Sequence, residues 1–310
     1  MAHNAFDDDE LSILSGTFRG LEWGLKQHYD EHLIDSLAVL SDTFNSDYIK
    51  FELQYLLLKV YAGNELWSDL LQSADAIRKE FPQKDNSQIQ HLIASAYSKL
   101  GHYSEADTTY KNVYQLDPSP DILTEWAELN LAQGNAAEAI AKLEQAYRQE
   151  PKSERLITLF EALAENLPDS LDTYYKKWSA IVTPLPEQVL LIRLKYAVDN
   201  WLPAEADSLC ALLINSSITN IRAQAQLTRG IAAFLQQHYE QAILELLRTI
   251  YLYADYQELV LTAKLYLIRT YLSQNLPNEA RPYYDEIEAK LSADQLKEFT
   301  PYFTAGEQHE

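Results

Sequence analysis

Apolar residues recur at helical spacing along most of the chain, and the pattern breaks at regular intervals. In the clearest stretch, Ile93 and Tyr97 lie on one face of a predicted helix that stops at Gly101. A second apolar stripe occupies residues 103–114 and ends before Pro118, which cannot extend a helix. This stretch therefore predicts two helices joined by a short turn, with a proline after the second helix.

The same arrangement repeats along the chain. Prolines recur at positions 82, 118, 151 and 184, so their spacing stays near one repeat length of about 34 residues. A residue pair, glutamate or glutamine followed by alanine, recurs at a similar spacing. The interval between Ala139 and Ala206 is the exception, because it spans two repeats. These alanines are Ala106, Ala139, Ala206, Ala242 and Ala280. Two unrelated markers with one period indicate an internal repeat, and we expect each alanine to lie where two helices cross closely.

Extending this register along the chain gives eight units, which start near residues 13, 51, 87, 120, 153, 187, 223 and 261. The unit at 153 is irregular, because Asp172 occupies the position of the packing alanine and residues 167–169 form the turn. The last two units are longer than the usual repeat, and residues 249–253 are expected to lengthen a helix there. Ser292 and Gln295 predict a capping box for a final helix, which Pro301 is expected to end.

The run Gly101-x-Tyr103-x-x-Ala106-x-x-x-Tyr110, closed by Pro118, resembles the tetratricopeptide repeat (TPR) family. Further copies of the motif are carried by Gly134, Ala139, Ala146 and Pro151, and by Gly230, Ala233, Tyr239 and Ala242. The resemblance covers about residues 13–291 and implies an all-α fold, a right-handed α-solenoid of about eight helix-turn-helix units. We therefore expect one elongated core in place of two globular domains. An acidic tail (1–12) precedes this array, and a capping helix (292–304) and a second tail (305–310) follow it.

Composition supports the helical interpretation and excludes several classes of function. The chain has only 8 glycines among 310 residues, so it lacks the supply of φ > 0 turn residues that strand-rich folds use. Its formal net charge is 25 − 46 = −21, which disfavours binding to nucleic acid or to anionic membrane surfaces. We expect no membrane span, because every apolar run is too short to cross a bilayer, and the acidic start shows no secretion signal. A cytoplasmic location is expected, or a periplasmic one if the natural N-terminus has been trimmed.

Candidate chemistry is sparse. His28 and His32 fit the H-x-x-E-H signature of one class of zinc hydrolase, but the repeat register places His28 at a turn between helices, where a solvated role is favoured. Cys210 is the single cysteine, which excludes an internal disulfide, and its position in the repeat predicts a buried, inert thiol. We expect no catalytic residue, no metal site and no cofactor. Tyr251, Tyr253 and Tyr256 form either an exposed contact patch or extra packing for the longer unit.

The family resemblance implies that the first helix of each unit lines a concave groove through unit positions 2, 5, 9 and 12. In the second to fifth units these positions are mostly polar and acidic, and they include Tyr55, Lys59, Gln88, His91, Ser95, Glu128, Glu161 and Ala164. In the last three units they are mostly apolar, and they include Gln188, Leu191, Lys195, Val198, Gln224, Leu227, Ile231, Phe234, Leu265, Arg269 and Leu272. The apolar C-terminal lining contains two isolated cations, Lys195 and Arg269, and there we expect a partner to place apolar anchors and acidic side chains. At the acidic half we expect the partner to place a basic segment. Alternatively, the C-terminal helix, with Phe299 and Tyr302, or a second copy of the chain covers this surface.

The resemblance favours a non-enzymatic scaffold or adaptor that binds a protein or peptide segment in this groove. The clamp of cations by which some family members hold a partner's C-terminal carboxylates is absent, because the corresponding positions carry Lys59, His91 and Ser95, then Thr124 and Glu128. A bacterial cell-envelope assembly factor is the alternative, because residues 239–291 also look like outer-membrane assembly proteins with the same repeat. A zinc hydrolase is a remote third interpretation. A homodimer through the C-terminal half is a further alternative.

Overall fold

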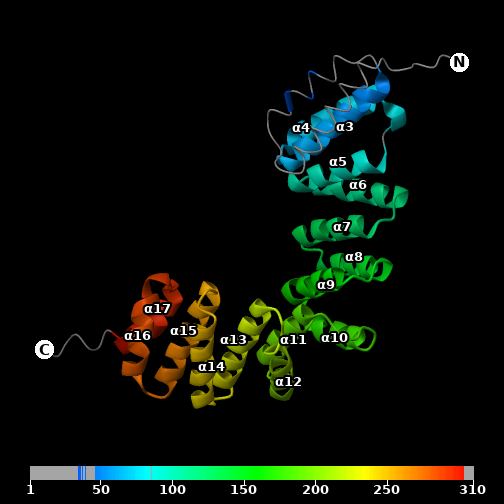
Figure 1. Cartoon of the computed structure of the whole chain (residues 1–310). Helices are drawn as coiled ribbons and strands as arrows, with labels where there is room; N and C mark the ends of the chain where they lie inside the picture. Colours follow the sequence, from blue (N-terminus) through cyan, green and yellow to red (C-terminus); the bar gives the residue numbers. More distant parts are fainter. Residues whose placement is uncertain (1–33, 36, 38, 40–45, 85, 304–310) are drawn as a thin grey trace. The chain divides into compact units, whose positions relative to one another are not determined.

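The computed structural model describes residues 34, 35, 37, 39, 46–84 and 86–303. Over these residues the chain forms fifteen α-helices and no strand, as the apolar pattern predicts (Figure 1). The helices belong to two compact bodies, an N-terminal body up to Pro151 and a C-terminal body from Lys152 onward. Continuity of one array across that boundary stays a prediction. Most of the predicted unit from residue 13 lies outside the described residues, as do both tails, His28 and His32.

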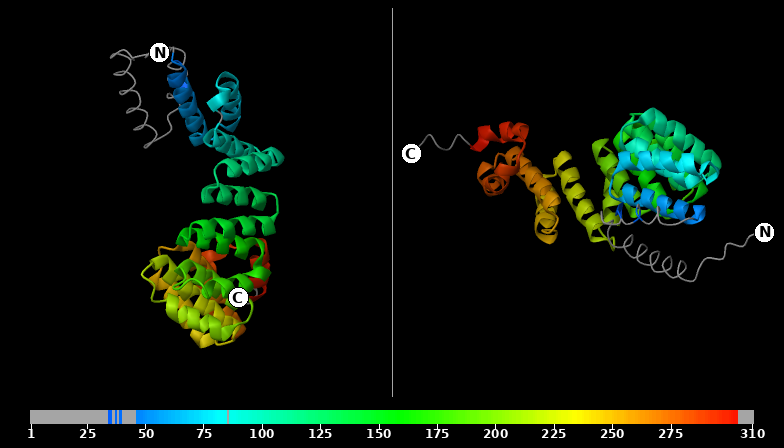
Figure 2. Two further views of the ribbon diagram at one scale, coloured as in Figure 1. Left: turned by 90° about the vertical axis from the view of Figure 1, so that its right-hand side faces the viewer. Right: turned by 90° about the horizontal axis from the view of Figure 1, so that it is seen from above.

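In the N-terminal body, residues 46–151 form three helical hairpins that follow one another in the order of the chain (Figures 1 and 2). The first helix of each hairpin contacts the first helix of the next, so that α3 packs on α5 and α5 on α7. The helices are α3 (Asp47–Gly63), α4 (Trp67–Glu80), α5 (Ser87–Lys99), α6 (Tyr103–Leu116), α7 (Pro120–Ala132) and α8 (Ala136–Gln149), and the 3-10 turn η1 (Pro82–Lys84) follows α4.

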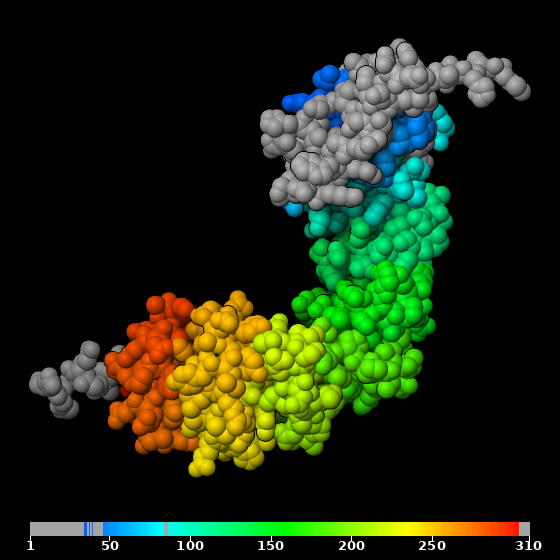
Figure 3. All heavy atoms as spheres, in the orientation of Figure 1, coloured from blue at the N-terminus to red at the C-terminus, as the bar shows by residue number. Residues whose placement is uncertain are grey.

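The C-terminal body continues the same alternation, with contacts in series from α9 to α11, α13 and α15. Side chains fill the spaces between the ribbons of its helices (Figure 3). Its helices are α9 (Ser153–Asn166), α10 (Leu171–Ser179), α11 (Glu187–Asp199), α12 (Pro203–Leu213), α13 (Thr219–Leu235), α14 (Tyr239–Leu252), α15 (Gln257–Ser273), α16 (Pro277–Ile287) and α17 (Ala293–Phe303), with 3-10 turns η2 (Pro168–Ser170) and η3 (Glu288–Lys290).

Six of the described hairpins share one turn of three residues. The middle residue of each turn has a positive φ between 56° and 76°, and the N–H of the third residue bonds to a carbonyl five residues earlier, as His102 does to Tyr97 at 2.9 Å. This is the Schellman arrangement, which satisfies carbonyls left open at a helix end. The middle residues are Glu65, Gly101, Gly134, Trp201, Gln237 and Asn275.

The predicted packing alanines are buried at the crossing of the two helices in each hairpin. Ala106, Ala139, Ala206, Ala242 and Ala280 have almost no solvent exposure. Gly230 makes a similarly close approach, because a Cβ at this position would lie 2.8 Å from Leu246 Cδ2. Small side chains at these points therefore set the separation of the paired helices.

The irregular hairpin of α9 and α10 replaces the alanine contact by an ion pair. Asp172 Oδ1 lies 2.9 Å from Nη2 of Arg193, a side chain on α11 that is only 3% exposed. Arg193 also donates to both carboxylate oxygens of Glu205 at 2.7 and 2.8 Å, and it lies over the ring of Tyr175 at 4.6 Å. A carboxylate at the alanine position is thus tolerated because the next helix supplies a buried guanidinium for it.

The C-terminal helix begins as predicted, but Pro301 does not end it. Ser292 and Gln295 exchange two hydrogen bonds, at 2.9 and 3.3 Å, which confirms the capping box. Pro301 lies inside α17, which continues to Phe303, because a proline in the last turn removes a single hydrogen bond and leaves the residues after it free to finish the turn. The helix packs through Phe299 and Phe303 against α15 and α16.

The expected lengthening at residues 249–253 is wrong. Helix α14 has 14 residues, as many as α6 and α8, whereas the first helices α13 and α15 each have 17. The extra residues of these units therefore lie in their first helices. Tyr251 is 71% exposed, whereas Tyr253 and Tyr256 are half-buried.

Candidate protein-binding faces

In the N-terminal body, the first helices present a network of polar side chains centred on Glu125. One oxygen of this carboxylate accepts hydrogen bonds from His91 at 2.7 Å, Ser95 at 3.1 Å and Tyr110 at 3.1 Å. The predicted groove residues His91 and Ser95 thus lie on a common face of α5, and α7 supplies their partner. Only about a third of the His91 and Glu125 side chains is exposed.

The two members of the pair stabilise each other's charge. The hydrogen bond to Glu125 raises the pKa of His91, against the opposing effect of burial. Burial alone would raise the pKa of Glu125, but hydrogen bonds from His91, Ser95 and Tyr110 outweigh it and lower that pKa. Partial burial, together with the negative charge of Glu125, raises the pKa of the Glu128 carboxyl.

Tyr55 and Lys59 continue this face onto α3. The Tyr55 hydroxyl donates to Gln88 Oε1 at 3.1 Å, and Lys59 Nζ lies 4.4 Å from the centre of the Tyr55 ring. The predicted groove residues of α3 and α5 are therefore neighbours. Within the described chain, Ser95 bonds to Glu125 and Tyr110 and not to His91, so this group lacks the nucleophile–base bond of a hydrolytic site.

In the C-terminal body, helices α9, α11 and α13 enclose a hollow of about 630 Å³, here called the α9–α13 hollow. Its lining combines apolar side chains such as Ala164 and Ile192 with carboxylates and amides. Several of its residues come from the predicted first-helix positions, namely Glu161, Ala164, Gln188, Leu191, Lys195 and Gln224. The unit positions predicted from the repeat therefore include residues of three helices that line one surface depression.

A second hollow, of about 440 Å³, lies where α13, α15 and α17 meet. Phe234, Tyr266, Leu272 and Tyr302 line it. Arg269 also lies here, and its Nε and Nη2 donate to Glu298 of α17 at 2.8 and 2.7 Å.

The interpretation of Arg269 as an isolated cation is therefore wrong, because a carboxylate of the C-terminal helix already neutralises it. Leu265 and Leu272 pack with Phe299 and Phe303 in one apolar cluster. The alternative in which the C-terminal helix covers part of the predicted groove is thus confirmed for α15.

The apolar lining is also less exposed than expected. Leu191 and Leu227 are each only 6% exposed, and Leu227 belongs to the core between α13, α14 and α15. Ile231 and Phe234 are half-buried against the same core. The long first helices α13 and α15 place these side chains against neighbouring helices, so Leu227 belongs to the core and not to an open groove.

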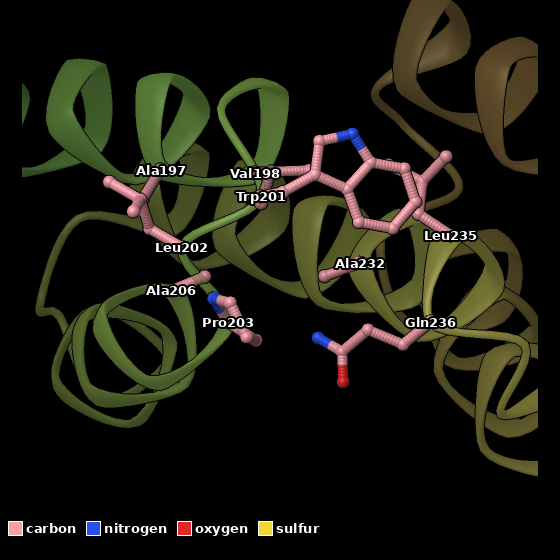
Figure 4. Close-up of a pocket in the computed structure, with 9 residues that line it drawn as sticks. All are labelled: Ala197, Val198, Trp201, Leu202, Pro203, Ala206, Ala232, Leu235 and Gln236. Carbon is pink, nitrogen blue, oxygen red and sulfur yellow. The ribbon is translucent and has the colours of Figure 1, made fainter.

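Trp201 stands at a third depression, beside the turn between α11 and α12 (Figure 4). Its indole is 64% exposed and lies near Leu235 and over Ala232, although its backbone φ of 56° is one that large side chains seldom adopt. The depression has a volume of about 20 Å³, which holds about one water molecule. It is too small for a ligand.

Sequence reasoning missed three carboxylates that matter to these faces. Glu125 lies one residue after a predicted groove position on α7, and Glu165 and Asp199 lie one residue after predicted groove positions on α9 and α11. The strict four-position register excluded them. A helix face about 100° wide includes such neighbours, and that rule would have found them.

The described part of the chain offers little other chemistry. There, no group of three or more His, Cys, Asp or Glu side chains is placed to hold a metal ion. Burial raises the pKa of the Cys210 thiol to about 12, in agreement with the predicted inert cysteine. Among the same residues, every helix is too short or too polar to cross a bilayer.

Residues 91–154 match the family model described as tetratricopeptide repeat. Comparison with curated protein sequences found no significant match. Among solved structures, the C-terminal part of a TPR repeat-containing protein from Cytophaga hutchinsonii is similar with a TM-score of 0.60 and 14% identity, over 80% of this chain and 98% of that one.

Two further structures show a weaker likeness. The Cut9–Hcn1 hetero-tetramer of the APC/C gives a TM-score of 0.50 at 16% identity, over 87% of this chain and 52% of that chain. The Pseudomonas aeruginosa protein pilF gives 0.44 at 18% identity, over 67% and 95%, and a likeness at this level carries no argument about function. Residues 91–154 therefore carry tetratricopeptide repeats, and the repeat spacing and the helical hairpins show that the rest of the described chain has the same helical-hairpin fold.

Proposed function

We propose that this protein is a scaffold that binds an extended segment of a partner protein, and that the α9–α13 hollow is its principal site. The supporting observation is the hollow itself, because side chains from three successive hairpins line one depression of about 630 Å³. Hollows of this size accommodate a few residues of a peptide or a small ligand. We propose no catalytic step for this site.

The lining suits a peptide in particular. Gln188 presents an amide with one donor end and one acceptor end, which is the pattern of a peptide bond. Ala164 and Ile192 supply apolar contact area for side chains of the bound segment. A segment in extended conformation exposes both kinds of group along its length, whereas a helix satisfies its own backbone.

Filling the hollow tests this function. Ala164 lines the hollow, so Ala164→Trp should block it, whereas Ala211→Trp adds the same side chain to an exposed position of α12 in the same body. Peptides selected from a random display library on the unaltered chain are expected to lose binding to Ala164→Trp by more than about tenfold and to keep binding to Ala211→Trp. Equal binding to both variants, with helicity retained, would contradict the proposal.

A further inference from the structure

The α9–α13 hollow contains more negative than positive charge. Glu161, Glu165 and Asp199 line it, and among the residues that the structure describes none of these three carboxylates has a hydrogen bond or an ion pair. Lys195 is the cation of the lining, and its Nζ is held by the neutral Gln224 Oε1 at 2.9 Å. An occupant of the hollow therefore encounters three carboxylates and one ammonium group.

Two of these carboxylates lie where the helices themselves favour a cation. Glu165 is in the last turn of α9, and Asp199 is the last residue of α11. Carbonyl groups give the C-terminal end of a helix a partial negative charge, which favours lysine or arginine there. Neither helix has a basic residue in its last turn, so the carboxylates and the helix ends repel one another without compensation.

We propose that the segment bound in this hollow carries a lysine or arginine side chain that docks against the lining carboxylates, among them Glu165 and Asp199 at the C-terminal ends of α9 and α11. The inference rests on the proposed function and states the chemistry of its partner. These carboxylates and the C-terminal ends of the two helices all attract a cation, whereas an acidic segment meets like charge. The apolar wall beside them accommodates the aliphatic part of such a side chain, since long basic residues bury their methylene groups and keep the charge near polar groups.

This proposal extends the basic segment expected at the acidic half, to which Glu161 belongs, and replaces the acidic side chain expected at Lys195. That expectation depended on Lys195 and Arg269 as isolated cations, but Arg269 is paired with Glu298 and Lys195 is bonded to Gln224. The hollow therefore keeps three carboxylates against the one ammonium group of Lys195, whose charge the neutral Gln224 does not cancel.

The test uses the full chain and the selected peptides described above. Peptides whose binding Ala164→Trp blocks are expected to be enriched in one lysine or arginine, and replacing that residue by alanine should weaken binding about tenfold. Glu165→Gln combined with Asp199→Asn should produce the same loss and abolish most of the salt dependence between about 0.05 and 0.3 M. The control pair Glu154→Gln and Asp207→Asn changes the net charge equally outside the hollow and should leave binding unchanged.

The outcomes separate this inference from the function on which it rests. Peptides that depend on the hollow but show no basic residue, or that bind the Glu165/Asp199 double variant as well as the control pair, overturn the inference and leave the scaffold function standing. A library that yields no peptide sensitive to Ala164→Trp overturns the scaffold function, and the inference with it. Far-UV circular dichroism of each variant establishes that the helices are retained.

Discussion

Single residues in this protein show how a repeat tolerates departures from its pattern. Arg193 is nearly buried, yet its guanidinium is bound by Glu205 and Asp172 and lies over the ring of Tyr175. Removing one member of such a buried group leaves a charge without compensation, which commonly costs more than the group contributes as a whole. Asp172, which looks like a defect in the repeat, is therefore tied to a residue of the next hairpin.

His91 and Glu125 make stability depend on pH in a defined window. The pKa of His91 is raised on folding, so its contribution is complete below the ordinary value of 6.5 and is lost as pH rises through the folded value. The pKa of Glu125 is lowered, so its contribution is complete above 4.5 and is lost as pH falls through the folded value. The pair therefore stabilises the fold most between about pH 4.5 and 6.5.

His91→Gln should consequently lower the free energy of unfolding more at pH 5.5 than at pH 9. We expect a difference of about 0.5–1 kcal/mol, because solvent screens a pair of which about a third is exposed. Urea denaturation of the variant at both pH values measures this difference. His102→Gln, at an exposed turn position of the same body, is the matched control and should show no comparable pH dependence. An identical loss at both pH values would contradict the role of the ion pair.

At the scale of helices, the distance between paired helices depends on residues with little or no side chain. Gly230 in α13 faces Leu246 in α14, and an added Cβ would lie 2.8 Å from Leu246 Cδ2 and 3.2 Å from its backbone nitrogen. Leu246 is fully buried, so it has little room to move away.

Gly230→Ala should therefore destabilise the protein although alanine is the better helix former. Helix propensity favours alanine by about 1 kcal/mol, and overpacking a buried crossing costs about 1–3 kcal/mol. We expect a net loss of about 1 kcal/mol, measured by urea denaturation. In a Leu246→Ala background the same change should become neutral or stabilising, because the opposing side chain is gone. A gain in stability from Gly230→Ala alone would show that the two helices can separate without cost.

The helical hairpins could be predicted from the sequence because small residues, prolines and apolar stripes record local packing at a fixed period. The second helix of each hairpin follows a short turn of constant length, so this pattern predicts its position well. Exposure of the first-helix residues could not be predicted, because it depends on contacts between helices distant in the chain. Leu272 packs in the cluster that contains Phe299, and Leu227 of the long helix α13 packs in the core with α14 and α15. The repeat register predicts neither of these contacts. Glu165 and Asp199 were not predicted as groove residues for a different reason. The four unit positions used to predict the groove cover a narrower part of the helix surface than a real helix face does.

At the scale of the whole molecule, each described helix makes its main contacts with helices close to it in the chain. Proteins built in this way have stabilities that are sums of repeat and nearest-neighbour contributions, and damage in one place need not spread. Phe299 is a suitable place to test this behaviour, since it has no solvent exposure and joins α17 to the cluster on α15 and α16.

Phe299→Ala should increase hydrogen exchange at the backbone amides of α15, α16 and α17 while α5 to α8 keep their protection. The expected local loss is about 3–4 kcal/mol, the usual cost of deleting a buried phenylalanine ring. Tyr302→Ala, which truncates a largely exposed side chain on the same helix, is the control and should leave exchange nearly unchanged. Equal acceleration in α5 to α8 would show that the chain unfolds as one cooperative unit.

The six three-residue turns, each with a left-handed middle residue, give these hairpins the same geometry, so that one hairpin could replace another. Within these hairpins the turn never changes length, whereas the connections from one hairpin to the next do, as residues 117–119 and 180–186 show. Variation in repeat length is thus absorbed by the connections and by the helices themselves, so duplication or exchange of a hairpin at a connection leaves each Schellman turn intact. Gene rearrangement and protein engineering can both use the connections as joints, and the position of the φ > 0 residue marks where each transferable piece is centred.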